Sequence, residues 1–217
     1  MGTYIETERL KLRDWEEKDL LPFQKMNANA QVRRYFPSLL SYRRSEIDME
    51  NMDSIIQESG LGLFAVELKE TGEWLGFIGV NYVSKDSHYP FKELPFYEIG
   101  WRLIPEVWGN GLATEGAEAV MKYARDKGIK ELYSFTSENN LPSRKVMEKL
   151  GMTFFSRYWD IWTLPSLGLF SKHYQSVPLT VNTSRLGIPN FLGMQPSKSQ
   201  PHFPSPHSKW SRSGSNE

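Results

Sequence analysis

The composition of the chain changes sharply near residue 175, and this change limits what can fold. Residues 175–217 hold six of the 13 prolines and nine serines, with one acidic residue against four basic ones. Such a segment offers little apolar surface to offset the chain entropy that folding removes. A chain of 217 residues is also marginal for two domains. We therefore expect one α/β domain in residues 1–174, followed by a disordered Pro/Ser-rich tail in residues 175–217.

Charge and cysteine content exclude several classes of function. The 26 basic and 26 acidic residues balance, so the net charge gives no reason to expect binding to nucleic acid or to an anionic membrane. The absence of cysteine excludes disulfides, thiolate zinc sites and a cysteine nucleophile, and it is compatible with the cytoplasm. No apolar run is long enough to span a membrane. We expect a cytoplasmic monomer or homodimer that needs no metal.

Periodicity in the first 174 residues predicts a mixed α/β sheet. Alternating apolar residues predict a strand at 9–15, and further strands are predicted at 62–69, 74–83, 96–103 and 131–136, the first two of these joined by the turn-like segment 70–73. Apolar residues at helical spacing predict helices at 20–30, 45–58, 111–127 and 141–150. This order of elements predicts a mostly antiparallel sheet flanked by helices, with a binding cleft beside the strand ends.

The segment from Pro105 to Glu115 carries the main chemical signal. Gly109 and Gly111 lie just after a predicted strand and at the start of a predicted helix. Glycines at such a place let backbone N–H groups approach an anion, and the helix dipole adds to the attraction. The turn could hold a pyrophosphate, or it could be simply a tight turn. It is not a full dinucleotide fingerprint, because Thr114 replaces the last glycine.

Three motifs in a fixed order favour a pyrophosphate-binding turn over a simple tight turn. They are Glu98-Ile-Gly-Trp-Arg-Leu103, Trp108-Gly-Asn-Gly-Leu-Ala-Thr-Glu115, and the run from Asn140 to Met152. With Thr7-Glu-Arg-Leu-Lys-Leu-Arg13 and Gly76-Phe-Ile-Gly79, they resemble the GNAT superfamily, in particular the branch of ribosomal-protein N-terminal acetyltransferases. The resemblance implies the GNAT fold and transfer of an acetyl group from acetyl-CoA to a primary amine by direct attack in a ternary complex. The amine acceptor could be a protein N-terminus or a small molecule.

The resemblance also assigns residues to acetyl-CoA. In this family the backbone of the strand before the glycine turn pairs with the pantetheine arm, which here falls on Trp101, Arg102 and Leu103. Backbone donors of the turn would hold the pyrophosphate; they belong to Trp108, Gly109, Asn110, Gly111, Leu112 and Ala113. Asn140 matches the family asparagine that meets the coenzyme near its pantetheine or reactive end, and Ser143 opens the next helical turn on the same side.

Acetyl transfer needs a base for the amine and an acid for the departing thiolate. Glu98 is the candidate base, because it lies on the strand that would carry the pantetheine, beside a partly apolar cleft. The alternative is a structural carboxylate that pairs with Arg102 or another cation. Tyr174 is the candidate acid by its position in the family, although it could equally pack within a final strand.

The end of the predicted domain departs from the family. GNAT enzymes close with two further strands, whereas Lys172–Gln175 passes directly into the Pro/Ser-rich tail. Either the tail is a true extension, or a changed reading frame has removed a strand. The alternative to an enzyme is therefore a degenerate relative that binds acyl-CoA without turnover and acts as a regulatory or binding module. The aromatic and basic residues around Tyr35 are expected to flank the acceptor cleft.

Overall fold

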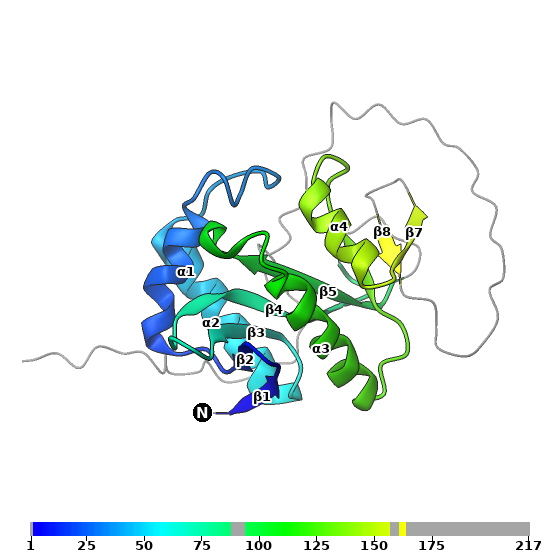
Figure 1. Cartoon of the computed structure of the whole chain (residues 1–217), viewed down its shortest axis with the longest axis horizontal. Helices are drawn as coiled ribbons and strands as arrows, with labels where there is room; N and C mark the ends of the chain where they lie inside the picture. Colours follow the sequence, from blue (N-terminus) through cyan, green and yellow to red (C-terminus); the bar gives the residue numbers. More distant parts are fainter. Residues whose placement is uncertain (1, 88–93, 157–160, 164–217) are drawn as a thin grey trace, which may run out of the picture.

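The computed structural model describes residues 2–87, 94–156 and 161–163. Eight strands form one sheet in the order β1-β2-β3-β4-β5-β6-β8-β7 (Figure 1). They are β1 (Thr3–Glu6), β2 (Leu10–Arg13), β3 (Leu63–Leu68), β4 (Trp74–Val83), β5 (Phe96–Leu103), β6 (Tyr133–Phe135), β7 (Thr153–Ser156) and β8 (Ile161–Thr163). Every neighbouring pair is antiparallel except β5 and β6. The mixed, mostly antiparallel sheet that the sequence predicts is thus confirmed.

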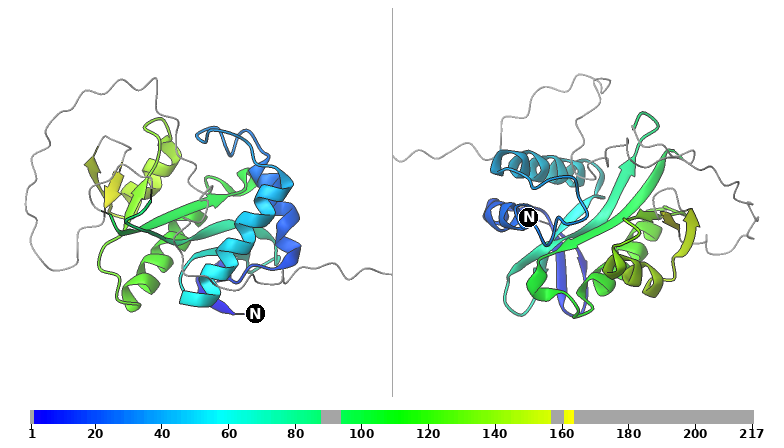
Figure 2. Two further views of the ribbon diagram at one scale, coloured as in Figure 1. Left: turned by 180° about the vertical axis from the view of Figure 1, so that it is seen from behind. Right: turned by 90° about the horizontal axis from the view of Figure 1, so that it is seen from above.

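Helices cover both faces of the sheet. Helices α1 (Leu20–Asn27) and α2 (Tyr42–Ser59) lie on one face, and α3 (Leu112–Asp126) and α4 (Leu141–Lys149) on the other (Figure 2). Two 3-10 turns, Glu17–Asp19 and Pro105–Val107, precede α1 and α3. None of the helices among the described residues combines the length and the apolar character needed to cross a lipid bilayer.

Strand β4 is the centre of the hydrophobic core because both of its faces are covered. Successive side chains of a strand point to opposite faces. Phe77 therefore packs edge-on against Phe23 of α1, with the ring centroids 6.2 Å apart. Ile78 packs on the other side, where its side chain fills the space beside Gly116 of α3. Phe77 and Ile78 are both buried, and β4 joins the two helical layers.

Some boundaries differ from the sequence prediction. Strand β1 is not predicted, and it extends the sheet by pairing with β2. Helix α2 begins at Tyr42, three residues before the predicted start, because the Ser41 hydroxyl accepts a hydrogen bond from the Arg44 backbone N–H and caps the helix. Ser45, the predicted first residue, is buried inside the helix, where its hydroxyl accepts a hydrogen bond from Asn27.

Two strands follow α4, as the family resemblance implies. Strand β8 pairs with β7 and with β6, so it inserts between them. The segment Lys172–Gln175, where the sequence departs from the family, lies outside the described residues. The sheet contains two closing strands ahead of that segment, and the suspicion of a missing strand loses its main support.

Candidate active site

Strands β5 and β6 separate along their length. As parallel neighbours they share one register pair in the described part of the chain, Glu98 opposite Tyr133. Strand β5 continues to Leu103, whereas β6 ends after two more residues. A cavity of about 560 Å³ follows β5 along this stretch, from Glu98 to Leu103. This volume is within the range of small-molecule sites.

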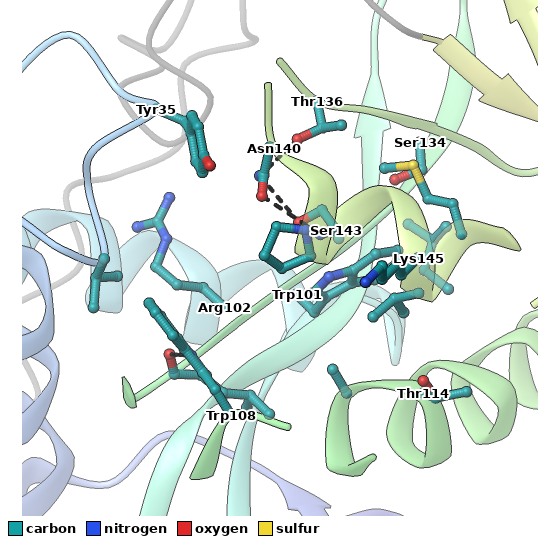
Figure 3. Close-up of a pocket in the computed structure, with 18 of the residues that line it drawn as sticks. Tyr35, Trp101, Arg102, Trp108, Thr114, Ser134, Thr136, Asn140, Ser143 and Lys145 are labelled. Atoms are coloured by element: carbon teal, nitrogen blue, oxygen red, sulfur yellow. Dashed lines mark hydrogen bonds between the residues drawn. The ribbon is translucent and has the colours of Figure 1, made fainter. Parts of the chain in front are cut away.

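Three segments enclose the cavity beside β5. The turn before α3 and its first residues form one wall, the segment from Ser134 to Lys149 forms a second, and residues 31–36 form a third. Figure 3 shows side chains from all three converging on the same space. The Tyr35 hydroxyl donates a hydrogen bond of 2.9 Å to the Asn139 carbonyl and so connects two of the walls. The expectation that the residues around Tyr35 flank the cleft agrees with this placement.

The cavity brings together most of the residues that the sequence assigned to acetyl-CoA. Those that line it are Trp101, Arg102, Leu103, Trp108, Gly109, Gly111, Leu112, Ala113, Asn140 and Ser143. Asn110 is not among the lining residues, because it turns its carbonyl to the Arg9 guanidinium, 3.0 Å away. Glu98 lines the same cavity. Tyr174, the predicted acid, lies outside the described residues.

The glycine turn has the backbone conformation that only glycine adopts easily. Gly109 and Gly111 have φ angles of 81° and 79°, in the left-handed region. Gly111 is the N-cap of α3, and the next residues, Leu112 to Thr114, line the cavity. The first N–H groups of a helix have no partner within the helix and attract anions. Together they form an anion-binding end of the cavity.

Two side chains fix this turn from outside the predicted site. The Arg9 guanidinium donates to the Glu115 carboxylate at 2.6 Å, and the Thr7 hydroxyl donates to the same carboxylate at 2.5 Å. Burial alone would raise the pKa of Glu115, but these hydrogen bonds outweigh it and lower the pKa. Since Arg9 also holds the Asn110 carbonyl, the N-terminal segment fixes the turn to α3. The sequence offers one clue to this contact: Thr7 and Arg9 belong to one of the family motifs, and Glu115 ends another.

Asn140 organises the opposite wall. Its side-chain oxygen accepts from the Ser143 backbone N–H and caps α4, while its amide nitrogen donates to Thr136 Oγ1 at 2.8 Å and to Ser143 Oγ at 3.1 Å (Figure 3). Because both hydroxyl oxygens accept from the same amide, their own protons point elsewhere. Both residues line the cavity, so this wall offers hydroxyl groups as donors to a bound molecule.

Glu98 is a buried carboxyl group at the point where β5 and β6 part. Burial raises its pKa and the neighbouring Asn81 side chain offsets this only in part, so that the pKa moves from 4.5 to about 8. A carboxylate with a pKa near the working pH is suited to general base catalysis. Within the described part of the chain Glu98 has no ion pair with Arg102 or with another cation, so the interpretation of Glu98 as a structural ion-pair partner has no support there.

Comparisons with known proteins agree with this geometry. A family model described as "Acetyltransferase (GNAT) domain" matches residues 9–153. The uncharacterized N-acetyltransferase YnaD of Bacillus subtilis is 27% identical over 168 residues, which cover 72% of this chain and 92% of YnaD.

Two further proteins, one sequence relative and one solved structure, are similar to this chain. The FsC-acetyl coenzyme A-N(2)-transacetylase of Aspergillus fumigatus is 34% identical over 107 residues, which cover 45% of this chain and 46% of that enzyme. The crystal form of RimL, a ribosomal alpha-N-protein acetyltransferase, in complex with coenzyme A superposes with a TM-score of 0.58 at 14% identity, covering 75% of this chain and 97% of RimL. The family match covers well over half of the chain, and the chain therefore belongs to the GNAT acetyltransferase family.

Proposed function

We propose that this protein transfers an acetyl group from acetyl-CoA to a primary amine, by direct attack of the amine in a ternary complex. The observation that carries the proposal is Glu98, a buried carboxyl with a pKa raised to about 8, which lines the same cavity as the glycine turn before α3. A base and an anion-binding turn in one cavity are what acetyl transfer from a coenzyme thioester requires.

The cavity suits acetyl-CoA along its whole length. The N–H groups at the start of α3 would hold the pyrophosphate, and the backbone from Trp101 to Leu103 would pair with the pantetheine arm. The indole N–H of Trp108 donates to the Leu103 carbonyl at 2.8 Å, which keeps the turn close to the end of β5. Two relatives support this choice of cosubstrate: one is named for acetyl coenzyme A, and RimL was solved with coenzyme A.

Catalysis would use residues of β5. Acetyl-CoA supplies the acetyl group as a thioester, and the backbone N–H groups of β5 would polarise its carbonyl. Glu98 takes a proton from the acceptor ammonium, directly or through water, so that the neutral amine can attack the thioester carbon. A new C–N bond forms and the C–S bond breaks. The nitrogen loses its second proton as the amide forms, the departing thiolate takes up one proton, and the proton held by Glu98 returns to solvent. Tyr174 remains our proposed donor of the proton to the thiolate.

The rival function is a degenerate module that binds acyl-CoA without turnover. Its support was the apparent loss of a closing strand, but β7 and β8 follow α4. The base candidate and the coenzyme residues lie in one cavity, which favours an enzyme.

Release of free thiol from acetyl-CoA in the presence of amines tests the proposal. The panel contains short peptides with a free N-terminus and small primary amines, and a matched set of N-methylated tertiary amines is the control. We expect thiol release that depends on the primary amine, with the N-acetylated product identified by mass. Tight binding of acetyl-CoA without release by any amine would contradict the enzyme and support the rival module.

A further inference from the structure

One face of β5 carries two ionisable side chains with a glycine between them. Because alternate residues of a strand point to the same side, Glu98, Gly100 and Arg102 share this face. A Cβ added to Gly100 would meet no atom within 4 Å, so the space above it is open. The Cα atoms of Glu98 and Arg102 are about 13 Å apart at the usual rise of a strand, a span that two side chains and a small molecule between them can fill.

The guanidinium of Arg102 lies beside aromatic rings at the wall of the cavity. Figure 3 shows it between Tyr35 and Trp108, and Arg102 lines the cavity. The rings of Phe36 and Phe77 lie 4.2 and 5.2 Å from its central carbon. Within the described residues it donates one hydrogen bond, of 3.1 Å, to the Asn27 side-chain oxygen, and it has no carboxylate partner. A guanidinium has five N–H donors, and several remain for a bound molecule.

The surroundings of Arg102 carry an excess of positive charge. Arg33 is buried nearby, and the nearest carboxylate is Asp48, which already pairs with Arg44 at 2.9 Å. Burial, and to a smaller extent Arg33, lower the pKa of Arg102 to about 9, because Asp48 raises it only in part. A buried cation that lacks an ion-pair partner is costly, and an anionic ligand would offset that cost.

We propose that Arg102 binds a carboxylate of the acceptor, so that the acceptor is a primary amine with a carboxylate a few bonds away, as in an amino acid. This inference rests on the proposed acetyl transfer. The amine lies toward Glu98 and the carboxylate toward Arg102, with Gly100 leaving room between them. The backbone of Arg102 and its side chain then have separate tasks, since the backbone faces the pantetheine and the side chain faces the acceptor. Guanidinium groups bind carboxylates through two parallel hydrogen bonds, which also orients the amine.

Binding of reaction products tests the inference without turnover. Calorimetry on the protein saturated with coenzyme A would compare N-acetylated glycine, leucine, phenylalanine and glutamate with the corresponding N-acetyl amino acid amides. We expect the best-binding acid to bind at least tenfold more tightly than its amide, and Arg102→Met to abolish this preference while Arg102→Lys keeps part of it. Equal affinity of the wild-type protein for acids and amides would overturn the inference.

Controls separate a ligand contact from a structural role. Arg43→Met removes a cation of α2 that does not line the cavity, so it should keep the preference for acids. If Arg102→Met does not fold, the wild-type comparison decides alone. Peptides that begin with aspartate or alanine distinguish a free amino acid from an acidic protein N-terminus as the source of the carboxylate. A preference for acids without thiol release would reject the proposed enzyme but keep the carboxylate site. Thiol release without a preference for acids would support the enzyme and reject the carboxylate site.

Discussion

Asn81 and Glu98 face each other in register across β4 and β5, and the Asn81 side chain lowers the pKa of the Glu98 carboxyl group. Both residues line the cavity. The amide stabilises the carboxylate, but burial outweighs it and leaves the pKa of Glu98 at about 8. The pair therefore holds a buried carboxyl group that exchanges its proton near neutral pH.

The raised pKa of Glu98 has a cost in stability that depends on pH. Between its unfolded value of 4.5 and its folded value of about 8, this carboxyl binds a proton in the folded state and not in the unfolded state. The stability it provides is complete below pH 4.5 and is lost as the pH rises through 8, at up to ~1.4 kcal/mol per pH unit. Glu98→Gln removes this titration. Its free energy of unfolding, relative to wild type, should increase from pH 5 to pH 7.5 in urea titrations.

Asp48 does not disturb this comparison. Burial raises its pKa to about 6, so it adds a loss of the same sign, but the loss is common to wild type and variant and cancels in the difference. A difference that stays constant across this pH range would contradict the buried, proton-binding state of Glu98.

A valine substitution in the glycine turn should weaken coenzyme binding selectively. Gly111→Val would put a β-branched side chain at a φ of 79° beside the anion site, whereas Gly72→Val would do so at a φ of 73° in the exposed β3–β4 turn. Both changes should cost about 1–2 kcal/mol of stability through backbone strain. Only Gly111→Val should weaken acetyl-CoA binding, by at least tenfold in calorimetry. Equal affinities of the two folded variants would refute the pyrophosphate assignment.

The contact between Arg9 and Glu115 predicts an indirect effect on the coenzyme. Neither residue lines the cavity, but Arg9 holds the Asn110 carbonyl of the glycine turn. Since Arg9 is partly exposed, we expect Arg9→Met and Glu115→Gln to cost only about 1 kcal/mol of stability each. Each should weaken acetyl-CoA binding several-fold, and the double variant should be no weaker than the worse single one. Additive losses in this double-mutant cycle would show that the two residues act independently.

Alanine substitutions of two glycines on neighbouring strands should differ in their effect on stability. A Cβ on Gly79 would lie 1.9 Å from the Gly62 carbonyl oxygen, whereas a Cβ on Gly100 would meet nothing. Gly79→Ala should therefore destabilise the fold by about 2 kcal/mol or more, and Gly100→Ala should not. Gly100→Leu should fill the proposed acceptor space, raising the KM for the amine at least tenfold with little change in acetyl-CoA affinity. An unchanged KM in folded Gly100→Leu would place the acceptor elsewhere.

Sequence patterns predicted the strands and helices best where local chemistry decides them. The apolar run of β4 and the glycine at position 60 that ends α2 needed no tertiary information. The start of α2 was wrong because the cap depends on which hydroxyl meets a backbone N–H, and Ser41 and Ser45 are both available. Strand β1 is only four residues long and exists because β2 offers it a partner, which local patterns do not record.

The candidate site was predictable only through the order of the motifs. Gly109 and Gly111 alone could not be told from a tight turn, and no pattern reveals that Glu98 is buried. The position of Arg102, between two aromatic rings and without a carboxylate partner among the described residues, depends on α1 and on the segment around Phe36. Such contacts arise between segments far apart in the sequence.

The pH dependence of kcat/KM for wild type and Glu98→Gln tests the central claim most directly. With a saturating acetyl-CoA concentration, the wild-type value should rise with pH and level off near pH 8, the pKa of Glu98. General base assistance is typically worth ~10² to 10⁴ in rate, so the variant should be at least tenfold slower at neutral pH. This deficit should shrink as rising pH deprotonates the amine unaided, while acetyl-CoA affinity stays unchanged. A folded Glu98→Gln variant with the wild-type rate and the same pH profile would contradict the account.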